Sequence, residues 1–287
     1  MKKLDGIALR DETLENLKVR ISNIKDNNIM PKVVFVVVGE DEASKIYVKH
    51  KERVCNKIGV ISEILKFPEN ISDKELKEKI DALNEDSSIH GILIQLPVPK
   101  TLLNDVSSLV NPKKDVDGIH PVNIDIQKSM SNVYTPTACT PFGIMKLLDK
   151  NDIKVKGVKV TIIGRSKIVG KPLAILMKNA GALVSVMHTQ TSPEDNKIML
   201  ENADILVSAS GVRGIVSKND VKNGVIIIDV GIHRINGKVT GDIDFESLKD
   251  KVSYYTPVPG GVGPMTIAML MENLITMIEQ NNILNKK

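Results

Sequence analysis

The segment KVTIIGRSKIVGKP, residues 159–172, contains the pattern that decides the fold of this 287-residue chain. A β-branched run, Lys159–Ile163, enters a glycine, and a short polar loop leads to a second glycine and a helix-forming stretch. Such a strand–turn–helix unit can bind a dinucleotide pyrophosphate at the helix N-terminus. Only Gly164 and Gly170 are present, so the spacing differs from the GxGxxG fingerprint. By spacing alone, an ordinary βα turn is the alternative interpretation.

The residues around this turn indicate which nicotinamide cofactor it accepts. The next strand, Leu183–Met187, is followed by His188, Thr189 and Gln190, without a carboxylate. An acidic residue there would bind the ribose hydroxyl of NAD, whereas a nearby arginine, such as Arg165, accommodates the 2′-phosphate of NADP. The sequence therefore favours NADP over NAD.

Short apolar runs alternate with helical stretches on both sides of this turn, which predicts parallel strands buried between helices. The expected further strands are Val33–Val38, Ile61–Phe67, Gly91–Leu96, Leu183–Met187, Asp204–Ala209 and Val225–Val230. This order predicts an α/β protein with two doubly wound domains and a cleft between them, the C-terminal domain being a Rossmann-like NAD(P)-binding domain.

The domain boundary is expected in the irregular stretch Pro112–Pro141, which shows no helical period. We expect residues 1–140 and the C-terminal helix 265–287 to form one domain. Residues 141–264 would then form the NAD(P)-binding domain.

Composition excludes several other classes of protein. The 39 basic and 35 acidic residues are mixed along the chain, which argues against a nucleic-acid binder. Every apolar run falls far short of the roughly 20 residues that span a membrane. The two cysteines, Cys55 and Cys139, lack metal-ligand spacing, and no signal peptide is evident. We therefore expect a soluble cytoplasmic protein that binds neither nucleic acid nor membrane.

Several polar positions could carry chemistry, although each also has an ordinary structural interpretation. Tyr47 and Lys51 lie four residues apart on one predicted helix face, where a lysine stem covering a tyrosine is the commoner arrangement. Gln95 ends a predicted strand. The Asp115-Val116-Asp117-Gly118 segment could be a capped turn or a fragment of a metal site, but it lacks further ligands. The glycines of PVPGGVGPMT, residues 257–266, would let the backbone approach a ligand.

Taken together and in this order, these segments resemble the bifunctional methylenetetrahydrofolate dehydrogenase/methenyltetrahydrofolate cyclohydrolase family over essentially the whole chain. The most specific segments are the GRSxIVGxP turn at 164–172 and the loop at 257–266. The resemblance implies oxidation of 5,10-methylenetetrahydrofolate with NADP and hydrolysis of the 5,10-methenyl product to 10-formyltetrahydrofolate, in one shared active site. It also implies a homodimer that binds tetrahydrofolate derivatives, with residues 1–140 and the C-terminal helix 265–287 as the folate-binding catalytic domain.

The resemblance also assigns catalytic roles to individual residues. Lys51 matches the catalytic lysine, and Tyr47 matches the tyrosine that stacks beside the folate. Gln95 matches the glutamine that hydrogen-bonds the lysine, and Asp117 matches the aspartate that binds the pterin ring.

Arg165 and Ser166 match contacts to the cofactor phosphates, and Thr189 stands where the family often has a serine that reaches the 2′-phosphate. Gln190 replaces a commonly basic residue. The other positions assigned to the cofactor are Gly164, Gly211, Ile232, Gly263 and Thr266.

The implied mechanism needs no metal. Hydride transfer is driven by the folate N5 lone pair, so the protein has only to orient the two rings. Hydrolysis requires proton management. A free lysine has a pKa of about 10.4, and burial in a crevice would lower the pKa of Lys51 toward the range of a general base.

Three rival functions are an enzyme with one of the two activities, a nucleotide-binding regulatory protein that has lost catalysis, and a different two-domain dehydrogenase such as a shikimate or amino-acid enzyme. The presence of Tyr47, Lys51, Gln95 and Asp117 argues against the first, and the retention of Lys51 argues against the second. The loop at 257–266 is unexplained by the third.

Overall fold

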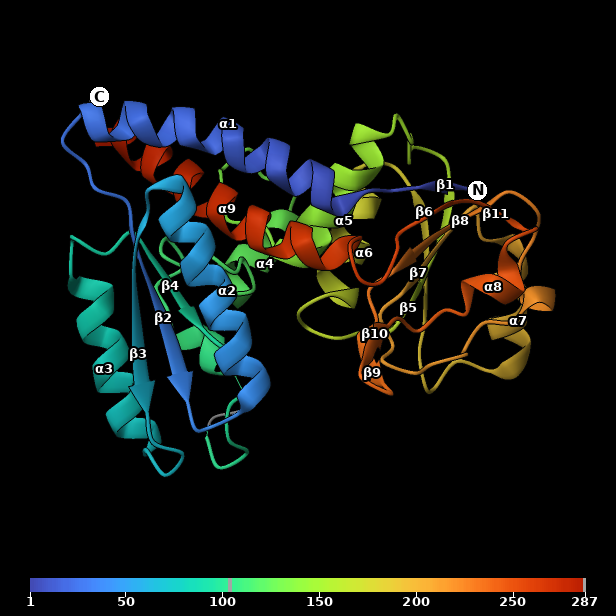
Figure 1. Cartoon of the computed structure of the whole chain (residues 1–287), viewed down its shortest axis with the longest axis horizontal. Helices are drawn as coiled ribbons and strands as arrows, with labels where there is room; N and C mark the ends of the chain where they lie inside the picture. The colour runs from blue at the N-terminus through green and yellow to red at the C-terminus, as the bar shows by residue number, and fades with distance from the viewer. Residues whose placement is uncertain (103–104, 286–287) are drawn as a thin grey trace. The chain divides into compact units, whose positions relative to one another are not determined.

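The computed structural model describes residues 1–102 and 105–285 of the chain (Figure 1). The chain divides into two compact α/β units. One contains Met1–Asp11 and Ala138–Met269, and we call it the six-stranded unit. The other contains Glu12–Thr137 and the residues from Leu270 onward, and we call it the three-stranded unit. The predicted two-domain α/β fold with parallel sheets is confirmed.

The six-stranded unit is built on a sheet with strand order β1-β11-β8-β7-β5-β6, in which every neighbouring pair is parallel. Its strands are β1 (Lys2–Lys3), β5 (Lys159–Ile163), β6 (Leu183–Met187), β7 (Ile205–Ser208), β8 (Val225–Asp229) and β11 (Val252–Tyr255). The strands alternate along the chain with α5 (Cys139–Lys150), α6 (Gly170–Asn179), α7 (Pro193–Asn202), α8 (Phe245–Leu248) and the short 3₁₀ helix η2 (Lys218–Asp220). All four residues of β7 are buried, as expected for a central parallel strand.

A small antiparallel hairpin, β9 (His233–Ile235) and β10 (Lys238–Thr240), follows β8. Its two-residue turn consists of Asn236 and Gly237, with φ of 49° and 75°. Positive φ at both positions is the geometry that Asn-Gly favours in tight hairpins. This hairpin was not predicted from the sequence.

The three-stranded unit has the parallel strand order β3-β2-β4, with β2 (Lys32–Val38) in the centre between β3 (Ile61–Phe67) and β4 (Gly91–Ile94). The six residues from Val33 to Val38 are all buried, which explains their continuous apolar character. Its helices lying wholly within the unit are α2 (Glu42–Ile58), α3 (Asp73–Glu85), α4 (Pro121–Lys128) and the 3₁₀ helix η1 (Val106–Leu109).

Local signals fix the ends of α2. The Asp41 carboxylate accepts a hydrogen bond from the Ser44 N–H at 2.7 Å, which satisfies a free donor of the first turn. The helix ends at Gly59, whose φ of 83° is a left-handed conformation that glycine adopts readily. These two caps determine where α2 begins and ends.

Two long helices, α1 (Gly6–Asp26) and α9 (Val262–Asn285), contribute residues to both units. Within the three-stranded unit, Arg20 of α1 forms ion pairs with Glu272 and Glu279 of α9, both at 2.6 Å. Its guanidinium also donates to the Thr276 hydroxyl at 2.8 Å. A guanidinium with several partners fixes these parts of α1 and α9 side by side, as Figure 1 shows.

The chain division differs from the expected one at both ends. The first eleven residues group with the six-stranded unit, because β1 pairs with Tyr254 and Tyr255 and the Gly6 N–H donates to the Gly260 carbonyl. Helix α9 begins at Val262 rather than 265, and its first eight residues belong to the six-stranded unit. Residues 286–287 of the expected helix lie outside the described residues.

The expectation of an irregular stretch throughout Pro112–Pro141 was also wrong. Helix α4 begins at Pro121, the first helical position, where proline is tolerated. The His120 ring nitrogen Nδ1 accepts from the Val122 N–H at 3.1 Å and caps this helix. Helix α5 already begins at Cys139, before the expected end of the irregular stretch.

Candidate active site

A buried lysine forms the centre of the candidate site in the three-stranded unit. Lys51 lies on the sheet-facing side of α2 and is only 8% exposed. Its Nζ donates to Gln95 Oε1 at 2.8 Å and lies 6.0 Å from the centroid of the Phe35 ring on β2. Since a buried amine is costly unless hydrogen-bonded, the contact with Gln95 helps to stabilise the lysine at this position.

Gln95 is held by the end of the sheet. Its backbone N–H donates to the Val36 carbonyl at 2.8 Å, which extends the ladder one residue beyond β4. Its side-chain Nε2 donates to the Leu96 carbonyl at 2.6 Å, so that Oε1 faces Lys51. The amide is therefore oriented as an acceptor for the lysine, and it contributes no charge.

Tyr47 lies one turn before Lys51 on α2 and is 44% exposed, in contrast to the buried lysine. An exposed aromatic ring beside a polar group can pack against a flat, partly polar ligand. The spacing of Tyr47 and Lys51 thus places the ring at the accessible edge of the helix face that carries the amine.

Asp117 lies in a loop that a neighbouring carboxylate holds in place. Asp115 is 4% exposed and forms a bridge with Ile92 of β4. Its oxygens accept from the Gly118 N–H at 3.0 Å, the His120 N–H at 2.8 Å and the Asn123 amide at 3.0 Å. The half-buried Asp117 is therefore presented by a loop with a fixed backbone, as the capped-turn interpretation predicts.

The pKa of Asp115 follows from this environment. Burial raises the pKa of this carboxyl to about 6. The His120 N–H and the Asn123 amide favour the charged form, while the nearby charge of Asp117 acts in the same direction as burial.

An Asp115→Asn variant is expected to reveal this shift in its pH dependence. The folded protein binds the proton more tightly than the unfolded chain, where an aspartate has a pKa of about 3.9. The stability contributed by Asp115 is therefore fully present below about pH 4 and is lost as the pH rises through about 6. The free energy of unfolding of the wild type minus that of the variant, measured with urea, should be larger at about pH 4.5 than at pH 7. Asp125→Asn, at an exposed position of α4, controls for charge loss; a difference that grows toward pH 7 would contradict the assignment.

The turn between β5 and α6 is closed by backbone contacts that only glycine permits. Gly164 has φ of 111°, and a Cβ atom there would lie 2.5 Å from the Ala209 carbonyl oxygen. A Cβ at Gly170 would lie 2.1 Å from the Gly164 carbonyl oxygen. The Ser166 hydroxyl accepts from the N–H groups of Val169 at 3.2 Å and Gly170 at 3.4 Å. The first residue of α6 is therefore packed directly on Gly164, the residue that follows β5.

Arg165 is exposed beside this turn, and its guanidinium donates to Gln190 Oε1 at 2.9 Å. Gln190 follows β6, next to the exposed Thr189. The Arg165 and Gln190 side chains thus come from two neighbouring strand ends and contact each other, and Thr189 directly precedes Gln190. The arrangement contains one positive charge and two uncharged polar groups.

The remaining residues assigned to the cofactor also belong to the six-stranded unit. Gly211 follows β7 and has φ of 67°, and Ile232 follows β8 and is 54% exposed. Both therefore lie beyond the carboxyl ends of parallel strands, which is the edge where ligands bind in such sheets. Gly263 is exposed at the start of α9, and the Thr266 hydroxyl lies 3.1 Å from that of Thr140.

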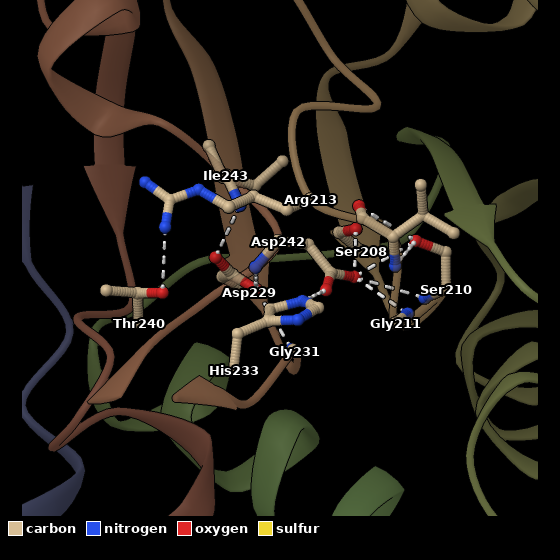
Figure 2. Close-up of polar contacts among 11 residues, drawn as sticks. Ser208, Ser210, Gly211, Arg213, Asp229, Gly231, His233, Thr240, Asp242 and Ile243 are labelled. Atoms are coloured by element: carbon tan, nitrogen blue, oxygen red, sulfur yellow. Dashed lines mark hydrogen bonds and ion pairs between the residues drawn. The ribbon is translucent and has the colours of Figure 1, made fainter. Parts of the chain in front are cut away.

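A pair of buried carboxylates that was not predicted from the sequence lies at this same edge. Asp229 is the last residue of β8, and Asp242 follows β10 (Figure 2). For Asp229, the available signal in the sequence was an aspartate directly after the apolar run Val225–Ile228. Asp242 lies far from this run in the sequence, and it reaches the sheet edge because the hairpin returns to the end of β7.

Within the described residues, no group of three or more His, Cys, Asp or Glu side chains has an arrangement that could hold a metal ion. Over the same residues, no helix combines the length and apolar character needed to cross a membrane. Cys55 is buried with its sulfur 3.7 Å from that of Met271, and burial raises the pKa of the thiol to about 12. This thiol is therefore not a nucleophile at neutral pH.

Comparison with known proteins agrees with this geometry. The family model described as the tetrahydrofolate dehydrogenase/cyclohydrolase catalytic domain matches residues 4–117, and the model for the NAD(P)-binding domain of the same family matches residues 138–282. The bifunctional protein FolD of Campylobacter concisus is 46% identical over 96% of each chain. That of Ligilactobacillus salivarius is 44% identical over 97% of each chain.

Solved structures show the same relationship. The bifunctional FolD dehydrogenase/cyclohydrolase of Campylobacter jejuni has a TM-score of 0.94 and 42% identity, over 98% of this chain and 99% of that one. The enzyme of Trypanosoma brucei, solved with NADP and an inhibitor, has a TM-score of 0.90 and 30% identity over 97% of each chain. The shikimate dehydrogenase of Aquifex aeolicus shares the fold alone. It has 13% identity and a TM-score of 0.52, over 88% of this chain and 97% of that one. The chain thus belongs to the tetrahydrofolate dehydrogenase/cyclohydrolase family.

Proposed function

We propose that this chain oxidises 5,10-methylenetetrahydrofolate with NADP and hydrolyses the 5,10-methenyl product to 10-formyltetrahydrofolate, using one folate site for both reactions. The observation that carries the proposal is the buried Lys51 amine, held at 2.8 Å by the uncharged Gln95 amide. Family membership supplies the reaction class, and this pair supplies a group that can handle the proton of the second reaction.

In this proposal, the three-stranded unit binds the folate through residues with distinct tasks. The exposed ring of Tyr47 packs against the flat pterin system, and the carboxylate of Asp117 accepts hydrogen bonds from its ring nitrogens. Asp115 holds the backbone on which Asp117 stands. Orientation is the main contribution to the first reaction, because the N5 lone pair of the folate already drives hydride loss.

The six-stranded unit fits NADP, which when bound accepts the hydride. The turn that contains Gly164 and Gly170 brings the backbone close to a pyrophosphate at the N-terminus of α6. Arg165 supplies the positive charge for the 2′-phosphate, and no carboxylate follows β6 to select the hydroxyl of NAD.

Hydrolysis places different demands on the protein. Water adds to the amidinium carbon of the methenyl group, one C–N bond breaks, and one proton is released. Lys51 Nζ is the group that takes and returns protons during this sequence. Gln95 holds Nζ through a hydrogen bond at 2.8 Å and brings no charge of its own to the site.

Arg165→Ala is expected to lower kcat/KM for NADP by about 10–100-fold, because one charge-assisted contact contributes roughly 1.5–3 kcal/mol. The value for NAD, which lacks the 2′-phosphate, should change little. Steady-state kinetics with both cofactors measure the ratio. Gln190→Ala serves as the matched control, since it removes the partner of Arg165 but keeps the charge; an equal loss with both cofactors after Arg165→Ala would contradict the assigned role.

A paired assay on the wild-type protein tests the proposed function as a whole. NADP reduction is followed with methylenetetrahydrofolate, and the loss of methenyl absorbance is followed separately. A non-reactive folate analogue should inhibit both reactions with the same inhibition constant. If neither activity is found with either cofactor, the proposed function is wrong and a binding role replaces it. Unequal inhibition constants would exclude a single folate site.

We also infer that the protein is a cytoplasmic homodimer. The resemblance to the family supports the dimer, and light scattering should give twice the chain mass of 31.5 kDa. Two buried cysteine thiols that form no disulfide, Cys55 and Cys139, are typical of a reducing compartment. A monomeric mass at micromolar concentration would contradict the dimer.

A further inference from the structure

A fully buried carboxylate joins two segments at the carboxyl edge of the six-stranded sheet (Figure 2). Asp242 is 0% exposed. Its Oδ2 accepts from the Ser208 hydroxyl at 2.8 Å, the Ser210 hydroxyl at 3.0 Å, and the backbone N–H groups of Ser210 and Gly211, both at 3.2 Å. Its Oδ1 lies 2.8 Å from His233 Nε2. One side chain therefore contacts both the segment after β7 and the segment after β8.

Asp242 is itself held by a second buried carboxylate. Its backbone N–H donates to Asp229 Oδ1 at 3.0 Å, and the same oxygen accepts from the Gly231 N–H at 2.9 Å. The Ile243 N–H donates to Asp229 Oδ2 at 2.9 Å. A Cβ at Gly231 would lie 2.0 Å from Asp242 Oδ1. The position of Asp242 is therefore fixed by close backbone contacts on several sides.

The charges around the pair are consistent with an ionised Asp242. Burial acts to raise its pKa, but the hydrogen bonds from His233, Ser208 and Ser210 outweigh burial and lower the pKa below its usual value. Burial raises the pKa of Asp229 to about 6. Asp242 accepts from five donors, and this geometry does not depend on the pKa shift of either aspartate.

Both segments that Asp242 joins carry residues assigned to the cofactor. Gly211 donates to Asp242 directly, and Ile232 immediately precedes His233. In the sheet, β7 and β8 lie on the opposite side of β5 from β6, where the 2′-phosphate contacts are assigned. A dinucleotide bound across β5 would therefore turn its nicotinamide half toward Gly211 and Ile232.

We propose that Asp242 and His233 are positioning residues, which hold the segments of Gly211 and Ile232 in the geometry that aligns the nicotinamide ring. The inference rests on the proposed use of NADP. Neither side chain takes part in chemistry or contacts the adenosine half of the cofactor. Their loss should impair alignment of the ring while leaving the adenosine half bound.

His233→Ala tests this inference, because its side chain is 23% exposed and its removal leaves the fold intact more readily than a change at the buried Asp242. A misplaced reacting group can cost about 10²-fold in rate. We expect kcat for NADP reduction to fall by about 10–100-fold, with the cyclohydrolase rate unchanged. The affinity for adenosine 2′,5′-bisphosphate, measured by calorimetry, should also be unchanged, and His233→Gln, which retains an N–H donor, should recover most of the rate.

Asp242→Asn is expected to have the same pattern of effects, and Lys238→Ala, at an exposed position of the same hairpin, should have none. Variants at His233 and Asp242 that reduce NADP within twofold of wild type would overturn the inference. Parallel losses of the melting temperature, of bisphosphate affinity and of cyclohydrolase activity would also overturn it, because they would show a purely structural role. If the wild-type protein itself does not reduce NADP, the proposed function is wrong. If the wild-type protein is active but the variants behave as wild type, only the positioning role is wrong.

Discussion

Replacing Lys51 with methionine is expected to lower the rate of methenyltetrahydrofolate hydrolysis by about 10²–10⁴-fold, the range that general acid–base groups contribute. Hydride transfer to NADP should fall much less, because that reaction depends on the orientation of two rings rather than on a proton acceptor. The methionine side chain keeps an unbranched stem near the Phe35 ring but cannot accept or donate the proton. Both rates are measured on the same preparation, so the ratio of the two losses is independent of protein concentration.

Two controls separate this result from simple damage to the fold. Lys49→Met removes an exposed amine from the same helix and should leave both rates near wild type. Thermal unfolding of the Lys51 variant reports whether the core near α2 is intact. If dehydrogenase and cyclohydrolase activities fell by the same factor while the folate KM rose, Lys51 would be a binding residue and the proposed proton role would be wrong.

The central strands of both sheets could be predicted because their sequences are almost continuously apolar. Val33–Val38 is buried on both faces, and Lys159–Ile163 is buried except at its first residue. Such runs are typical of strands covered on both faces of a parallel sheet. The edge strand Ile61–Phe67 was predicted from its alternation of apolar and polar residues, and β11 was not predicted. By contrast, β1 consists of Lys2 and Lys3, which carry no strand signal. It forms because Tyr254 and Tyr255 of β11, which pair with β8 on one side, offer their other edge to it.

The candidate site was only partly accessible from sequence. The spacing of Tyr47 and Lys51 follows from helical geometry, but the contact between Lys51 and Gln95 spans 44 residues and depends on how α2 packs on the sheet. Similarly, Ser208 and Asp242 are 34 residues apart and meet only because the hairpin after β8 returns to the end of β7. Pattern within one element predicts a face, whereas contacts between elements require the register of the sheet.

Gly170→Ala is expected to weaken cofactor binding and folding together, because the added methyl group has no space. Its Cβ would lie 2.1 Å from the Gly164 carbonyl oxygen, 2.7 Å from the Gly164 carbonyl carbon and 2.9 Å from Arg165 Cα. All three are backbone atoms, so the strand end and the helix N-terminus must move apart. Forced packing of this kind costs about 1–3 kcal/mol. We expect a comparable loss in the free energy of unfolding and a rise of about 10–100-fold in the dissociation constant of NADPH.

The losses of NADPH affinity and of stability in this variant test whether the turn binds the cofactor. Fluorescence titration with NADPH and urea unfolding measure the two effects, and the cyclohydrolase rate should fall least, because Lys51 and Gln95 belong to the other unit. Lys178→Ala, at an exposed position in the last turn of the same helix, controls for a substitution in α6 that adds no contact. Unchanged affinity for NADPH in a destabilised Gly170→Ala protein would mean that the cofactor does not use the N-terminus of α6. Since Arg165 directly follows Gly164, the same outcome would also remove the physical basis for assigning the 2′-phosphate to Arg165.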